Sequence, residues 1–290
     1  MASFQQFYSE SFRREVLQVE KLRRQIIINY FVIGFVLLAG FIFEAITWML
    51  VGIAFIVLFI LFYIRTFGVS TDHFKERFFR QIQGKIGTFL LPNAQFDINR
   101  YIKLSVLQDA MLLSIAPGQY GGRNLIEGRT GDDLIQISEI DAWGNAKNEK
   151  GLAVKEHFFK GWAGIRVQHK SQFPVSIITD QAIEEISGKA INMQDMDASD
   201  LLFWTDNQDW FDTIFTPAIL LKIVQFRENT GCNVYISTHG DTVCVATIPK
   251  VQSAYSDAGI WNRVENEKEI EKIFRQEAFI AELLLSLHAV

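Results

Sequence analysis

The chain has 290 residues, of which 49% are hydrophobic and 21% are charged, and its formal net charge is -5. This composition excludes an intrinsically disordered chain, a collagen-like repeat and a disulfide-rich scaffold. The acidic balance also argues against a nucleic-acid-binding protein, because such proteins neutralise phosphates with an excess of Lys and Arg. We therefore expect a folded chain with no nucleic-acid partner.

Residues 1–24 are predicted to form a charged amphipathic helix on the cytosolic side of a membrane. Its apolar positions follow a loosely helical spacing, and they are Phe4, Phe7, Phe12, Val16 and Val19. The pattern leaves open whether this helix lies on the membrane or on the folded domain.

Residues 25–65 are predicted to form a transmembrane helical hairpin. Between Ile26 and Ile64 the clearly polar side chains are Asn29, Glu44 and Thr47. One helix of this length would measure roughly 58 Å, about twice the hydrocarbon thickness of a bilayer, so the chain should fold back once. We place the break near Glu44, because a carboxylate is costly at the bilayer centre and is accommodated at a hairpin tip.

The two predicted spans are Ile26–Phe43 and Ala45–Ile64. Each contains thirteen Ile, Leu, Val and Phe residues, which supply roughly -4 to -8 kcal/mol of insertion free energy per span. Lys and Arg flank both spans and are absent from the tip. The positive-inside rule therefore predicts a multi-pass protein of the bacterial inner membrane with both termini in the cytoplasm.

Residues 66–94 are predicted to contain a basic juxtamembrane helix over Asp72–Gly87. Its apolar side chains recur every fourth residue, at Phe74, Phe78, Ile82 and Ile86. Gly87 is the expected stop. The basic side chains near the membrane could contact lipid headgroups, and they are Arg65, Lys75, Arg77, Arg80 and Lys85. The alternative is an ordinary helix that packs on its own domain.

Residues 95–290 are predicted to form a cytosolic α+β domain of mostly antiparallel strands with segregated helices. The dipeptides Gly131-Asp132 and Gly240-Asp241 are typical of hairpin turns. Thr216 and Pro217 predict the start of a helix that Gly231 ends. A last helix is expected over about Asn266–Leu287. The segment Gly144–Gly151 is expected to be flexible.

The chain has two cysteines, Cys232 and Cys244. A two-residue turn at Gly240-Asp241 would place Cys244 opposite Ser237 and Cys232 opposite Pro249. The two thiols would then not face each other, so we expect both to be free and buried.

No catalytic residue is predicted, and no cofactor. The chain lacks a G-x-S-x-G motif and the histidine spacings of zinc enzymes. Six aspartates lie within residues 195–212, where Asp195, Asp197 and Asp200 are weak candidates for metal ligands. A calcium-binding loop starting at Asp195 would need glycine where Asp200 stands. We expect a solvated acidic loop there, and mainly core positions for the tryptophans.

Three segments resemble a bacterial membrane protein family known as domain of unknown function 3137. They are Leu125–Ile140, Phe159–Trp162, and Ile214–Pro217 with the strands that follow it. The resemblance ends after Pro249, where Val251–Trp261 lacks the acidic-aromatic element expected of the family. It implies no activity or catalytic residue, and it implies a LemA-type membrane protein as a partner.

The sequence thus favours a membrane-anchored, non-enzymatic scaffold or regulatory protein that binds a partner through its cytosolic domain. Two alternatives remain open. The first is a lipid-sensing or lipid-binding module at the inner leaflet, with membrane lipids as its partners. The second is a membrane-bound hydrolase or metal-dependent enzyme. Whether the chain forms homo-oligomers also stays open.

Overall fold

The computed structural model describes residues 4–44, 57–61, 71–91, 93–112, 118–147, 153–168, 172–180, 185–186, 189–190, 194–196, 201–249, 264 and 266–287. The chain divides into two compact units. One comprises Met1–Phe7, Gln83–Ser253 and Lys268–Val290, and we call it the sheet unit. The other comprises Tyr8–Ile82 and Ala254–Glu267, and we call it the helical unit.

The helical unit is built around one long helix, α2 (Glu10–Glu44), which packs against α4 (Thr71–Phe78). A π-helical segment, Phe79–Gln83, follows α4. The N-terminal part of α2 buries one apolar stripe, made of Phe12, Val16, Val19, Leu22 and Ile26. Residues 57–61 are also helical. The rest of the second predicted span, together with Arg65, lies outside the described residues.

The expected helix over residues 1–24 is interrupted near its start. The first turn, α1 (Phe4–Phe7), belongs to the sheet unit, and α2 begins at Glu10. The backbone N–H of Phe12 donates to the hydroxyl of Ser9 at 3.5 Å. A serine hydroxyl can satisfy a backbone donor of the first helical turn, which favours a new helix start at this position. From Glu10 onward the charged segment and the first predicted span form one continuous helix.

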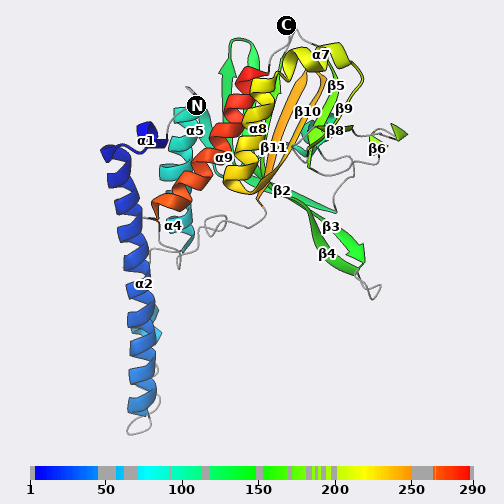
Figure 1. The fold of residues 1–290 in the computed structure, drawn as a ribbon. Coiled ribbons are helices and arrows are strands. Elements are labelled where there is room, and N and C mark those ends of the chain that lie inside the picture. The colour runs from blue at the N-terminus through cyan, green and yellow to red at the C-terminus, as the bar shows by residue number, and fades with distance from the viewer. Residues whose placement is uncertain are drawn as a thin grey trace. The chain divides into compact units, whose positions relative to one another are not determined.

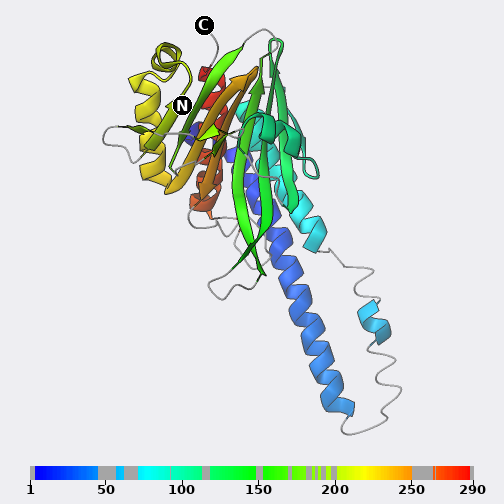
Figure 2. The same cartoon turned by 90° about the vertical axis from the view of Figure 1, so that its right-hand side faces the viewer.

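The sheet unit contains a nine-stranded sheet within the described residues, with the order β1-β2-β3-β4-β11-β10-β5-β9-β8 (Figures 1 and 2). Every pairing is antiparallel, which confirms the predicted α+β class. The strands are β1 (Gln95–Asp97), β2 (Gln119–Thr130), β3 (Asp133–Lys147), β4 (Ala153–Val167), β5 (Phe173–Thr179), β8 (Gln194–Met196), β9 (Leu201–Thr205), β10 (Cys232–Gly240) and β11 (Thr242–Pro249). A separate pair joins β6 (Glu185–Ile186) to β7 (Lys189–Ala190).

Both predicted hairpins are confirmed. Thr130 pairs with Asp133 around Gly131, and His239 pairs with Thr242 around Gly240. Both glycines have positive φ, a backbone conformation that is unfavourable for residues with a side chain. Of the segment Gly144–Gly151, expected to be flexible, residues 148–151 lie outside the described residues, whereas Gly144 to Lys147 belong to β3 and pair with β4. Cross-strand pairing satisfies the backbone there.

The cysteines lie where the turn predicts them. Cys244 pairs with Ser237 and Cys232 with Pro249, and both thiols are free and buried. Burial raises the pKa of the Cys244 thiol to about 12. Because the thiolate is the reactive form, Cys244 is not a nucleophile at neutral pH.

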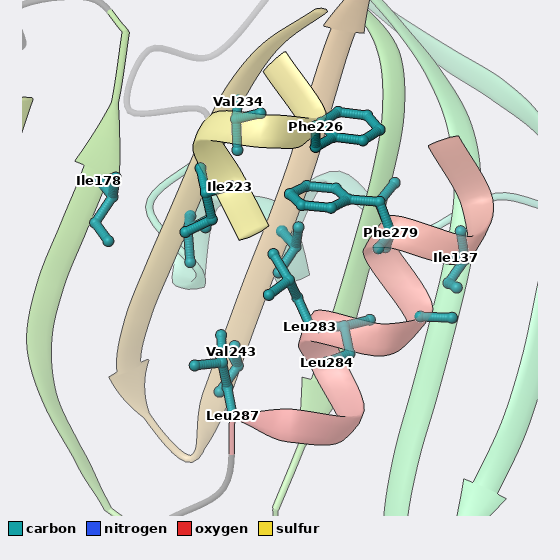
Figure 3. Close-up of a cluster of buried hydrophobic side chains, with 14 of the residues drawn as sticks. Ile137, Ile178, Ile223, Phe226, Val234, Val243, Phe279, Leu283, Leu284 and Leu287 are labelled. Atoms are coloured by element: carbon teal, nitrogen blue, oxygen red, sulfur yellow. The ribbon is translucent and has the colours of Figure 1, made fainter. Parts of the chain in front are cut away.

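Two long helices cover one face of the sheet, α8 (Pro217–Thr230) and α9 (Glu267–Ser286). In the close-up of this core, the rings of Phe226 and Phe279 stack between them at a centroid distance of 3.8 Å (Figure 3). Lys222 and Glu282 form an ion pair between the same helices at 2.5 Å. Gly231 ends α8 in the left-handed conformation, as predicted. Leu285, near the end of α9, is 38% exposed.

A third helix of this layer, α5 (Gly84–Leu90), corrects the role predicted for Gly87. The helix continues three residues past this glycine. A Cβ at Gly87 would lie 2.7 Å from the side chain of Ile126 on β2. Gly87 therefore serves close packing of α5 on the sheet rather than helix termination.

The opposite face of the sheet is covered by residues 101–112, which include α6 (Leu104–Asp109; Figure 2). Side chains of the sheet bind the backbone carbonyls of this segment. Tyr235 donates to Met111 at 2.6 Å, and Ser237 donates to Ala110. Burial raises the pKa of the Tyr235 hydroxyl, so it stays a hydrogen-bond donor throughout the physiological range. Sequence periodicity did not predict α6, because six residues are too few for a helical pattern.

The contact between α9 and β4 gives a prediction for stability. A Cβ at Gly164 would lie 2.3 Å from Ile280 and 2.9 Å from Leu284. We expect Gly164→Ala to lower the free energy of unfolding by about 1–3 kcal/mol through overpacking. Gly121→Ala is the matched strand control, since its Cβ would meet nothing within 4 Å. Denaturant unfolding of both variants in detergent checks this, and equal stabilities would contradict the packing.

Candidate functional site

Packing among the described residues does not account for the apolar part of α2. A segment of it, Phe12–Ala39, is long and apolar enough to cross a membrane, and 17% of its most apolar window is buried. Phe31 is 70% exposed and Phe35 is 71% exposed, with Leu38 at 58%. A soluble protein rarely leaves such a contiguous apolar surface in water, so this helix fits a membrane anchor.

A buried ionic cluster lies on α2 just before the apolar stretch, and we call it the Glu20 cluster. The Glu20 carboxylate accepts hydrogen bonds from Arg23 at 2.7 and 2.8 Å and from Arg24 at 2.8 Å. It also accepts from the backbone N–H of Val264 at 3.0 Å. Glu20 is 2% exposed, so these contacts replace the hydration that burial removes. The cluster thereby joins the chain just before α9 to the base of the apolar helix.

A shallow cleft of about 170 Å³ opens on the helical unit, lined by Tyr8, Arg13, Val16, Leu17 and Glu267. Burial and the charge of Glu267 raise the pKa of Tyr8, and Arg13 opposes this shift. The cleft holds charges of both signs and no nucleophile paired with a base. Its lining combines a phenol, a cation and a carboxylate with two apolar side chains.

The predicted membrane-contact residues that the structure describes are all exposed. Lys75 and Arg77 lie on α4 and Arg80 on the π-helical segment, whereas Lys85 belongs to the sheet unit. Arg80 pairs with Glu76 at 3.0 Å on the surface, where an ion pair contributes little to stability. The three basic side chains of the helical unit are thus accessible to an anionic surface.

The acidic stretch at residues 195–212 is not one solvated loop. Asp195 lies in β8, Asp197 and Asp200 lie outside the described residues, and Asp209 and Asp212 lie on α7 (Gln208–Ile214). The side chain of Asn207 caps α7 by accepting from the N–H of Trp210 at 3.1 Å. Among the described residues no three His, Cys, Asp or Glu side chains lie close enough to hold a metal ion.

The structure also reveals a buried polar group that our sequence analysis missed. Glu277 on α9 is fully buried, and neither oxygen of its carboxyl group has a hydrogen-bond partner among the described residues. Burial and the nearby charge of Glu139 raise the pKa of Glu277 well above its ordinary value. The sequence periodicity indicated this burial, because Glu277 lies on the same helical stripe as Phe274, Ala281 and Leu284.

The carboxylate of Glu139 has donors on the neighbouring strand β2. Arg123 on β2 donates to the Glu139 carboxylate at 2.7 and 3.1 Å. Asn124, fully buried with a φ of 61°, points its amide nitrogen to the same carboxylate at 3.4 Å. Arg123 and Asn124 thus donate to Glu139, whereas no donor among the described residues reaches the carboxyl group of Glu277.

The chain matches no family model and no curated protein. A solved structure with a similar trace is the mycobacterial trehalose monomycolate transport factor A, TtfA. It is 11% identical, and the match covers 73% of this chain and 97% of that chain at a TM-score of 0.39. A likeness of this size carries no argument about the activity of the present chain.

Proposed function

We propose that this chain is a membrane-anchored scaffold or regulatory protein whose sheet unit binds a protein partner in the cytoplasm. The observation that carries the proposal is the exposed apolar surface of α2, which needs lipid rather than water around it. In this proposal Ile26–Phe43 and Ala45–Ile64 form two spans, and the protein is a multi-pass protein of the bacterial inner membrane. The flanking Lys and Arg residues support a cytoplasmic location for both termini.

The partner that we propose for the sheet unit follows from the family resemblance of its segments. The resemblance to domain of unknown function 3137 favours a LemA-type membrane protein as the partner. Cross-linking of the full chain in its native membrane, followed by identification of the linked peptides, tests this partner directly. Links that never include such a protein would contradict it.

The proposed topology predicts where an alkaline phosphatase reporter is active. A reporter inserted at the tip after Glu44 should be active in the periplasm, and reporters at either terminus should be inactive. Combining Phe31→Asp with Phe35→Asp costs about 5–7 kcal/mol at the centre of the span, which offsets most of its insertion free energy. We expect tip activity to fall at least about tenfold in that double variant.

The matched control is Leu221→Asp, which changes a residue on α8 that is 57% exposed. It should leave the activity of the tip reporter unchanged. An inactive tip reporter in the unmodified chain, or an active one at a terminus, would overturn the hairpin.

A second candidate function is recognition of anionic lipids, favoured by the exposed Lys75, Arg77 and Arg80. Each basic residue near an anionic surface contributes about 1 kcal/mol, and salt screens the attraction. In nanodiscs, anionic lipid should therefore slow amide exchange in α4 relative to neutral lipid. Reversing all three charges to Glu should abolish that difference.

Arg275→Glu is the control for this charge reversal, since Arg275 is exposed on α9 and paired with Glu271. It should preserve the lipid dependence of exchange in α4. Identical exchange in anionic and neutral nanodiscs would exclude lipid sensing by α4.

A further inference from the structure

We propose that the carboxyl group of Glu277 is a proton-operated latch, which holds α9 on the sheet when it is protonated and weakens that docking when it is ionised. This regulatory device goes beyond the proposed function and does not depend on it. It rests on the position of Glu277, on the groups around it and on the place of α9 in the chain.

The position makes the charge state of Glu277 matter for packing. α9 supplies a large part of the core on this face of the sheet, as the side chains of Phe279, Leu283 and Leu284 show (Figure 3). Glu277 lies one turn from Ile273, Phe274 and Ala281, which are buried as well. Any charge that appears on Glu277 while α9 is docked is therefore removed from water, which strongly disfavours the docked state.

No donor in the described residues compensates such a charge. Both oxygens of Glu277 lack a hydrogen-bond partner there. The charged group that acts on Glu277 is the carboxylate of Glu139, which repels a second negative charge. Arg123, the cation beside that carboxylate, makes a two-point contact with Glu139. The ionised form thus meets repulsion without a matched attraction.

The charged side chains on the other elements packed on α9 contact groups other than Glu277 or are exposed. From α8, Lys222 pairs with Glu282 at 2.5 Å. From β4, Arg166 binds Asp133 at 2.7 Å and donates to the backbone carbonyl of Leu284 at 2.8 Å. On α5, Lys85 is exposed, and α1 contributes Phe-Gln-Gln-Phe without a charge.

The sign of the effect follows from linkage. Burial and Glu139 raise the pKa of Glu277 above its ordinary value of 4.5, so the docked state prefers the protonated form. Docking is strongest below the ordinary value and weakens as the pH rises from there toward the raised value. Within that window, one linked proton changes the opening equilibrium of α9 by up to about tenfold per pH unit.

The latch has a route to the membrane helix along the chain itself. Val264, three residues before α9 begins at Glu267, is bound by its backbone N–H to Glu20 on α2. Release of α9 would therefore free the segment that follows this attachment. Proton concentration is the signal to which such a device responds.

The test is amide hydrogen exchange of the full chain in nanodiscs between about pH 5.5 and 8.5, above the ordinary carboxyl pKa. Rates are corrected for the intrinsic pH dependence, and β10 and β11 serve as the internal reference. The opening constant of α9 should rise with pH by up to about tenfold per unit in the unmodified chain. In Glu277→Gln it should be independent of pH.

Glu271→Gln is the matched control, because Glu271 lies on the same helix and pairs with Arg275 at 2.6 Å. It should keep the full pH dependence. A flat profile in the unmodified chain, or an equal slope in Glu277→Gln, would overturn the latch.

If Glu277→Gln does not fold, a second variant tests the proposal. Glu139→Gln removes the repelling charge, so ionisation of Glu277 should become easier and the opening constant should reach its plateau at lower pH. An exchange profile identical to that of the unmodified chain would contradict the proposal.

Discussion

The structure of this protein depends on one constraint, which is that the apolar surface of α2 cannot remain in water. Beyond Ile26 the helix carries Ile, Leu, Val and Phe on every side, and packing within the chain covers few of them. A helix that is apolar all round is buried either in a protein core or in a bilayer. The exposed Phe31 and Phe35 exclude the first case for this part of α2.

The two units solve the burial of charge in different ways. In the helical unit, Glu20 is buried together with two arginines and a backbone N–H, so its charge is fully compensated. In the sheet unit, Glu139 has Arg123, whereas Glu277 has no donor among the described residues. A buried carboxyl group without a donor favours its neutral form. That contrast is why we assign a proton-dependent role to Glu277 and a structural role to Glu20.

Much of the sheet unit could be predicted from local signals. Turn dipeptides fixed the register of both hairpins, because Gly131 and Gly240 occupy positions that demand positive φ. Pro217 and Gly231 bounded α8 for similar reasons of backbone conformation. The α+β class followed from the order of these elements, since strand runs with separate helices seldom form parallel sheets.

What could not be predicted depends on contacts between segments far apart in sequence. Gly87 reads as a helix stop, and only Ile126 on β2 reveals its packing role. The acidic run at residues 195–212 gave no sign of α7, because a seven-residue helix is too short for a periodic pattern. The place of Glu277 on the buried stripe of α9 was visible in the sequence, whereas the effect of the Glu139 charge on it was not.

The most direct test of the central claim is the environment of Phe35 in a bilayer. A nitroxide label on Phe35→Cys in the full chain, reconstituted into liposomes, can report collisions with oxygen and with a water-soluble nickel complex. Native Cys232 and Cys244 are buried and should stay unlabelled. We predict high oxygen and low nickel accessibility at Phe35, and the reverse for a label on Leu221→Cys. Equal access of the nickel complex to both positions would contradict the membrane anchor.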